Sequence, residues 1–261
     1  MPDTRRITGP ESSLSPYTFS ADFTATPTQP LNNGVRADGR QEKQHRPVYL
    51  QAGLITQARG SAYAEFNRTK VICAVEDFQM QGQITCEVKF ATFSCQMRRQ
   101  PVQDNQEKDM STQLLEALEP AVCLHKFPKS QVDVYVRVLE NDGSALSAAI
   151  TCASVALADA GIEMYDLVVG CTAKLHGQTI LVDPTVSEEN APSTGAGKPG
   201  GQVTLGLMPS LHQVSALAFH GDVDFDVLSQ AVQTCQDSCQ KLYPILQQTL
   251  VKTVTERMKD T

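Results

Sequence analysis

The chain has 261 residues, of which 41% are hydrophobic, and its formal charge at neutral pH is −7. This length is sufficient for a sizeable core, whereas the negative charge disfavours a free-standing nucleic-acid-binding protein, which normally carries a basic face. No apolar run approaches the ~20 residues that a membrane-spanning helix needs, and the N-terminus lacks the apolar core of a signal peptide.

Residues 1–34 are rich in Ser, Thr, Pro and Asn, and they contain too few large apolar groups to offset the entropy of ordering. We expect a flexible N-terminal arm over 1–34 and a single domain over 35–261. The domain opens with four segments of strand-favouring residues, which predict an antiparallel sheet because they follow one another so closely. These segments are PVYLQAGLI, SAYAEF, KVICAVEDF and ITCEVKFATF (47–55, 61–66, 70–78 and 84–93).

The middle of the chain predicts a helix, a strand and a second helix. The first helix is expected over 110–122, and segment 131–140 alternates valines with polar residues, as a half-buried strand does. The second helix is expected to run from a Ser144 cap to Ala160, with Gly161 as its stop. Nearly all its residues are small or apolar, so we expect it to be buried on most sides.

Two strand pairs and a long helix complete the predicted elements. The pairs are expected over 166–183 and 201–221, and the low-complexity segment 191–201 between them is expected to be a mobile loop. From 222 to about 258 the apolar residues step by three or four, which predicts an amphipathic helix of many turns. Pro244 is expected to kink or break it.

Eight cysteines are present, and most lie inside apolar runs, where a thiol behaves as a small hydrophobic group. Cys235 and Cys239 are one helical turn apart, but no second pair and no nearby histidine has ligand spacing. We therefore expect no metal and no other cofactor. Buried, reduced thiols without an export signal indicate an intracellular protein.

Several motifs together resemble those of the RNase PH family. The resemblance covers roughly residues 36–258, and it is closest to the ring subunits of the eukaryotic RNA exosome. It implies an RNase PH-like fold of the α/β (two-layer α+β) class, with mixed sheets, βαβ units and a long C-terminal helix. The motifs are RADGR (36–40) with Arg46–Pro47, GSAYAEFNRTKVICAV (60–75), LEALEPAV (115–122), DGSALSAAI (142–150) and ALADAGIEMYDLVVGC (156–171).

Enzymes of this family use inorganic phosphate to attack the 3′-terminal phosphodiester of RNA, which requires cations or N–H donors around the phosphate. The resemblance aligns their phosphate-binding arginine with Leu146 and a neighbouring threonine with Ala145. Helix 110–122 carries Glu116 and Glu119, and it has none of the arginines found there in active members. The resemblance therefore implies a degenerate active site and a protein that is not an enzyme.

The two catalytic aspartates of active members align with Glu189, or with Glu188 after a shift of one residue, and with Gln202. We expect Glu189 to be a solvated charge on a mobile loop and Asp183 to be a turn or strand-end residue. The alternative is an active phosphate-dependent 3′-to-5′ exoribonuclease that uses Glu188 or Glu189. An unrelated small-molecule enzyme of α/β type is a third hypothesis.

Arg98 and Arg99 lie in the loop that, by the resemblance, faces the central pore of the ring, where they would contact RNA phosphates. An ordinary solvated basic loop explains them equally well. The resemblance implies a heterodimer with another RNase PH-like subunit in a six-membered ring, S1/KH-type cap subunits and an associated exoribonuclease. Such a subunit would guide single-stranded RNA and would occur in the nucleus, the nucleolus and the cytoplasm. No membrane partner is expected.

Overall fold

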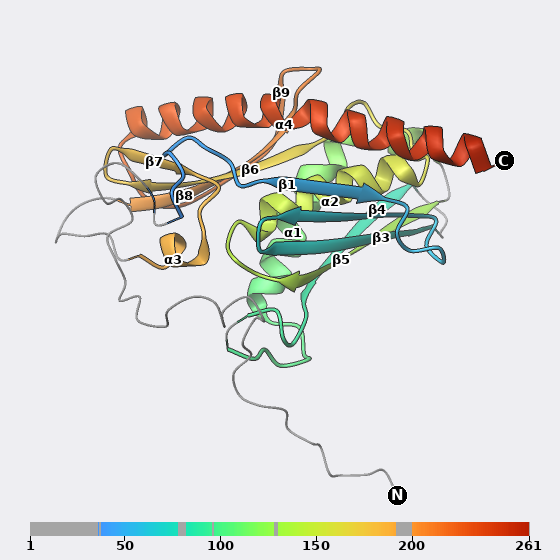
Figure 1. Ribbon diagram of the computed structural model, residues 1–261, viewed down its shortest axis with the longest axis horizontal. Helices are drawn as coiled ribbons and strands as arrows, with labels where there is room; N and C mark the ends of the chain where they lie inside the picture. The colour runs from blue at the N-terminus through green and yellow to red at the C-terminus, as the bar shows by residue number, and fades with distance from the viewer. Residues whose placement is uncertain are drawn as a thin grey trace, which may run out of the picture.

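The computed structural model describes residues 36, 38–77, 82–95, 97–127, 130–191 and 200–260 (Figure 1). The arm expected over 1–34 and most of the loop expected over 191–201 lie outside these residues. None of the helices in the described part of the chain is long and apolar enough to cross a membrane.

The first sheet has five strands in the order β1-β2-β3-β5-β4. All neighbours are antiparallel except β4 and β5, which are parallel. One face is apolar because apolar residues, most often valine and alanine, occupy every second position. The strands are β1 (Val48–Ala52), β2 (Gly60–Phe66), β3 (Thr69–Asp77), β4 (Gln83–Phe90) and β5 (Gln131–Glu140).

The expectation that the four opening strands pair in succession is wrong for the fourth. β4 continues through α1 (Asn105–Leu118) to β5, which inserts between β3 and β4 and forms a βαβ unit. Two side chains of α1 satisfy the outer edge of β4, where Ser111 Oγ accepts the N–H of Val88 at 2.9 Å and Glu107 Oε1 accepts that of Phe90 at 2.8 Å. Strand periodicity in the sequence could not predict that β4 lies at the edge of the sheet, because its hydrogen-bonding partner on that side is helix α1.

Helix α1 begins five residues earlier than predicted. Asp104 and Glu107 form a capping box, in which Glu107 Oε2 accepts the N–H of Asp104 at 2.9 Å. Two short 3₁₀ turns, Glu119–Ala121 and Leu124–Lys126, follow the helix.

The second sheet has four strands in the order β7-β6-β8-β9, and every described pair is antiparallel. Short turns join β6 to β7 and β8 to β9 as hairpins, whereas a longer connection over 183–199 joins β7 to β8, which lie on either side of β6. The strands are β6 (Val169–His176), β7 (Thr179–Val182), β8 (Gly200–Met208) and β9 (Gln213–Asp222).

Helix α2 (Ala145–Asp159) lies between the two sheets and contacts β2 and β3 on one side and β6 and β8 on the other. Its burial on most sides is confirmed, and Gly161, with φ +74°, ends it as predicted. The small residues permit very close approach. A Cβ added to Gly170 of β6 would lie 2.5 Å from the carbonyl oxygen of Ser147. The mixed α/β fold class is confirmed, and α2 packs against both sheets.

The long C-terminal helix is confirmed as α4 (Phe225–Asp260), which runs past β1 and the strands of the second sheet (Figure 1). Pro244 does not break it. Leu242 and Leu246, on either side of the proline, are buried in the core, and this packing compensates for the one hydrogen bond that Pro244 cannot donate. A short helix α3 (Val186–Glu189) follows β7.

Candidate functional site

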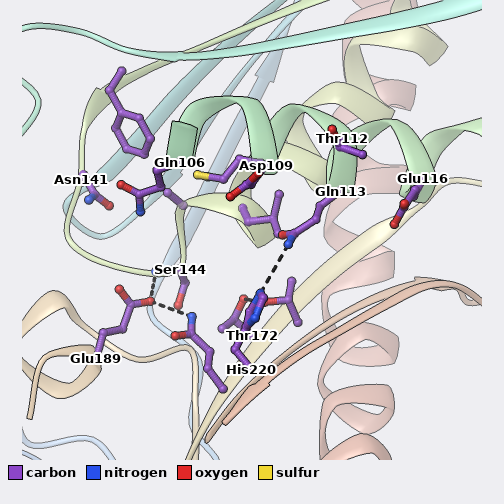
Figure 2. Close-up of a pocket in the computed structure, with 16 residues that line it drawn as sticks. Gln106, Asp109, Thr112, Gln113, Glu116, Asn141, Ser144, Thr172, Glu189 and His220 are labelled. Carbon is purple, nitrogen blue, oxygen red and sulfur yellow. Dashed lines mark hydrogen bonds between the residues drawn. The ribbon is translucent and has the colours of Figure 1, made fainter. Parts of the chain in front are cut away.

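A cavity of about 570 Å³ lies between α1, the turn before α2 and strands β8 and β9 (Figure 2). Its size is that of a small-molecule site. The described residues that line it include no lysine and no arginine. They do include three carboxylates and several carboxamides, namely Asp109, Glu116 and Glu189, and Gln106, Gln113, Asn141 and Gln202.

The floor of the cavity is the start of α2, where the expected Ser144 side-chain cap is absent. Ser144 has φ +53°, an uncommon value for a residue other than glycine, and its hydroxyl donates to the carbonyl of Pro184 at 3.0 Å. Glu189 Oε1 accepts the N–H of Ser144 at 2.9 Å and that of Gln202 Nε2 at 3.3 Å (Figure 2). A carboxylate of the protein itself therefore lies at the positive end of the helix dipole.

Glu189 is half-buried on α3, so the expectation of a solvated charge on a mobile loop is wrong. The expectation failed because α3 has only four residues, which is too few for hydrophobic periodicity to reveal a helix. Burial raises the pKa of Glu189, although the Ser144 N–H opposes the rise.

Glu188 belongs to a separate, buried ion pair. Its side chain accepts two hydrogen bonds from Arg36, with Nε at 2.7 Å from Oε1 and Nη2 at 2.6 Å from Oε2. Burial alone would raise the pKa of Glu188, but the bonds from Arg36 outweigh it and lower that pKa. Because both oxygens are engaged, Glu188 is not positioned to act as an acid or base in the cavity.

The turn beneath the cavity is held by a second buried ion pair. Asp183 directly follows β7, as expected, but its carboxylate binds Arg46 through contacts of 2.6 and 2.9 Å. The same guanidinium donates to the carbonyls of Asp142 at 2.8 Å and Gly143 at 3.1 Å. Burial opposes ionisation of Asp183, but the His45 ring nitrogen 3.5 Å away and Arg46 hold its pKa well below the usual range.

The two arginines expected to contact RNA lie in different environments. The Arg99 guanidinium is 4.2 Å above the ring centroid of Phe90, and its Nη2 donates to Gln106 Oε1 at 2.9 Å. Arg98 is exposed, and no hydrogen bond or ion pair joins it to any other described residue. Phe90 and Gln106 also line the cavity, so Arg99 borders that site while Arg98 points to solvent.

Cys235 and Cys239, which lie one turn apart on α4, are buried in the core. Cys239 Sγ donates to the carbonyl of Val169 at 3.5 Å, and all eight cysteines are free thiols. No group of three metal-binding side chains occurs in the part of the chain that the structure describes.

The family model described as "3′ exoribonuclease family, domain 1", that of RNase PH, matches residues 44–163. The human protein named "Exosome complex component MTR3" is 40% identical over 98% of this chain and 97% of its own length. The chain belongs to the RNase PH family.

Further relatives within the RNase PH family agree. The protein of Schizosaccharomyces pombe named "Exosome complex component mtr3" is 34% identical over 90% of each chain. Among solved structures, rice Rrp46 superposes with a TM-score of 0.71 at 23% identity, covering 82% of this chain and 99% of its own. An Archaeoglobus fulgidus exosome "with RNA bound to the active site" gives a TM-score of 0.70 at 21% identity, covering 80% and 92%. At 23% and 21% identity, these two structures support the fold of this chain and not its function.

The cavity gathers the positions that the resemblance assigned to the RNase PH active site. Ala145, Leu146, Glu189 and Gln202 all line it, although up to 57 residues separate them along the chain (202 − 145). The roles of Arg36, Arg46 and Asp183 could not be read from the sequence, although RADGR and Arg46–Pro47 belong to the family motifs and so marked those arginines.

Gly143 is expected to be intolerant of a side chain. Its φ is +88°, and a Cβ would lie 2.5 Å from the carbonyl oxygen of Pro184. Gly143→Ala should therefore lower the free energy of unfolding by about 1–3 kcal/mol, measured by urea denaturation. Gly177→Ala is the control, because Gly177 also has a positive φ (+62°) but no heavy atom within 4 Å of an added Cβ. An equal effect of both variants would show that contact with Pro184 contributes nothing.

Proposed function

We propose that this chain is a non-catalytic subunit of an RNA exosome core ring, which supports 3′-to-5′ RNA processing and degradation by guiding single-stranded RNA to a separate nuclease. Full-length similarity to two proteins named as MTR3 exosome components supports the assignment to the ring. Archaeal relatives named Rrp41, such as that of Cenarchaeum symbiosum at 34% identity over 84% of this chain, belong to the same kind of complex by name.

The observation that carries the non-catalytic part of the proposal is the chemistry of the cavity. Inorganic phosphate needs charge-assisted hydrogen bonds, each of which contributes roughly 1.5–3 kcal/mol. The cavity offers no lysine or arginine among its described lining residues, and it presents Asp109, Glu116 and Glu189 instead. Glu189 also occupies the N-terminal end of α2, so an incoming phosphate would be repelled where it most needs a donor.

In this proposal the subunit pairs with a second RNase PH-like chain, and three such heterodimers close the ring. S1/KH-type cap subunits and an exoribonuclease associate with it, and the particle acts in the nucleus, the nucleolus and the cytoplasm. Arg98 contributes a phosphate contact at the pore, and Arg99 supports the loop that carries it.

Purified chain incubated with RNA and inorganic phosphate is expected to release no nucleoside diphosphate, because the described lining of the cavity offers no lysine or arginine to hold the attacking phosphate. The release is measured by chromatography, and a Glu189→Gln variant should likewise release no nucleoside diphosphate. Phosphate-dependent release that this substitution abolishes would instead identify an active exoribonuclease.

Association with the ring has its own test, which is the native mass and subunit composition of the particle isolated with this chain. We expect other RNase PH-like subunits, cap proteins and a nuclease in stoichiometric amounts. Recovery of the chain alone would contradict the proposal.

A further inference from the structure

The cavity carries negative charge that no described residue neutralises. The side chains of Asp109 and Glu116 are exposed and form no hydrogen bond or ion pair with any other described residue. Glu189 accepts both of its side-chain hydrogen bonds, from the Ser144 N–H and from Gln202, on Oε1 alone. Its Oε2 is therefore unengaged within the described part of the chain.

The basic groups near Glu189 are engaged elsewhere. Lys174 Nζ donates to the backbone carbonyl of Glu189 at 3.1 Å and not to its carboxylate. The guanidinium of Arg46 is paired with Asp183. Neither base lines the cavity, so three carboxylates face it without a lysine or arginine among its described lining residues.

The three carboxylates are spread along the cavity and are not gathered at one point. Asp109 and Glu116 belong to α1 and lie seven residues apart, about 10 Å along the helix axis. Glu189 lies on the opposite wall, beside Ser144 (Figure 2). Oxygens that bind one Mg²⁺ or Ca²⁺ ion lie about 2.0–2.6 Å from it, so a single ion cannot reach all three carboxylates. The spacing fits a cation whose charges are themselves separated.

Apolar and carboxamide groups lie between these charges. Met110 and Leu146 line the cavity and are half-buried, so they offer apolar surface to a hydrocarbon chain. Gln113 of α1 also lines it and adds a carboxamide, which can accept a further N–H. The walls therefore match a ligand that alternates ammonium groups with methylene segments.

We propose that this cavity binds a linear aliphatic polyamine of the spermidine class, with its ammonium groups paired to Asp109, Glu116 and Glu189 and its methylene segments against Met110 and Leu146. A lysine or arginine side chain inserted by another protein would bring one charge to three carboxylates, whereas a triamine brings three. The inference goes beyond the proposed function, because it requires neither RNA nor a ring.

Isothermal titration calorimetry of the purified full chain with spermidine, at low ionic strength, tests the site. Native chain is expected to bind one spermidine. Glu189→Gln should weaken binding by about 10- to 150-fold, since it removes one charge-assisted hydrogen bond of a half-buried carboxylate. Asp109→Asn and Glu116→Gln should each weaken binding by up to about 5-fold, because exposed ion pairs contribute less.

The matched control is Glu119→Gln. Glu119 follows α1 directly and is exposed, but it does not line the cavity. This variant changes the net charge by the same amount as Glu189→Gln and should leave the affinity for spermidine unchanged. An equal loss with both variants would place the binding on the general surface charge and would overturn the inference.

The class of cation is tested with Mg²⁺ and 1,4-diaminobutane, which carry equal charge. The diamine should bind more tightly than Mg²⁺, because its charges are separated and Mg²⁺ gives up its water reluctantly. Spermidine should bind more tightly than the diamine. If Mg²⁺ bound as tightly as the diamine, the cavity would respond to charge alone and would not be a polyamine site.

A second variant tests the site without removing any hydrogen bond of the folded chain. Leu146→Lys places an ammonium group in the cavity, where it should pair with Glu189 and weaken spermidine binding by at least about 10-fold. Thermal unfolding confirms that the variant is folded, and spermidine should raise the Tm of the native chain more than that of the variant. Equal increases in Tm would contradict the inference.

Failure of spermidine to bind the folded native chain would also overturn the inference. The assignment to the ring would then stand, because it is supported by similarity to exosome components. Phosphate-dependent release of nucleoside diphosphate would instead contradict the proposed function. The two failures are therefore distinguishable.

Discussion

Asp183→Asn is expected to lower the free energy of unfolding by about 3–5 kcal/mol, measured by urea denaturation of the purified chain near pH 7. Asparagine has nearly the same shape as aspartate but no charge, so Arg46 would remain buried without a counter-ion. Both side chains are almost inaccessible, at 1% and 2% exposure. The control is Glu163→Gln, which removes an exposed ion pair with Lys126 and should cost no more than about 1 kcal/mol.

The pH dependence of this difference has a definite sign. The pKa of Asp183 is lowered in the folded state, so its contribution is fully present above the unfolded pKa of about 3.9 and is lost as the pH falls toward the folded value. The stability gap between native protein and Asp183→Asn should therefore be constant from about pH 5 to 7 and narrow below about pH 4. A gap that widened on acidification would contradict the assigned ion pair.

The second large effect is a gain of phosphate binding when the cavity is rebuilt. Leu146→Arg alone is expected to bind inorganic phosphate weakly, because the new guanidinium would pair with Glu189. Combining it with Glu189→Ala frees both the guanidinium and the N–H of Ser144. The double variant should bind phosphate roughly 10- to 150-fold more tightly than Leu146→Arg, the equivalent of one charge-assisted hydrogen bond of about 1.5–3 kcal/mol.

Isothermal titration calorimetry with inorganic phosphate measures this difference. Leu146→Gln with Glu189→Ala is the matched control, because glutamine supplies a donor without a charge. If Leu146→Arg bound phosphate as tightly as the double variant, Glu189 would not be what closes the site to anions.

Local sequence patterns were sufficient to predict the elements in which apolar or small residues repeat most regularly. The alternating valines of 131–140 became β5, and the small residues after Ser144 became the buried helix α2, because burial follows directly from these repeats. The position of β4 could not be predicted in the same way. Its edge is satisfied by Ser111 and Glu107, and a contact with a helix leaves no mark on strand periodicity.

For the candidate site, sequence comparison identified which residue types meet but not how they bond. It placed Leu146 and Glu189 together, yet it gave no sign that the Glu189 carboxylate would accept the N–H of Ser144, 45 residues earlier. Nor could it separate Arg98 from Arg99. Adjacent residues of identical type differ here only because one lies over Phe90, and that is a property of the folded loop.

The buried arginines near the start of the described chain constrain the order in which contacts can form while the chain is being translated. Arg46 bonds with a carboxylate 137 residues later, and Arg36 with one 152 residues later. On the ribosome, this opening segment cannot be fastened until α3 has left the exit tunnel. Each guanidinium must therefore remain without its carboxylate partner until the second half of the chain has been translated.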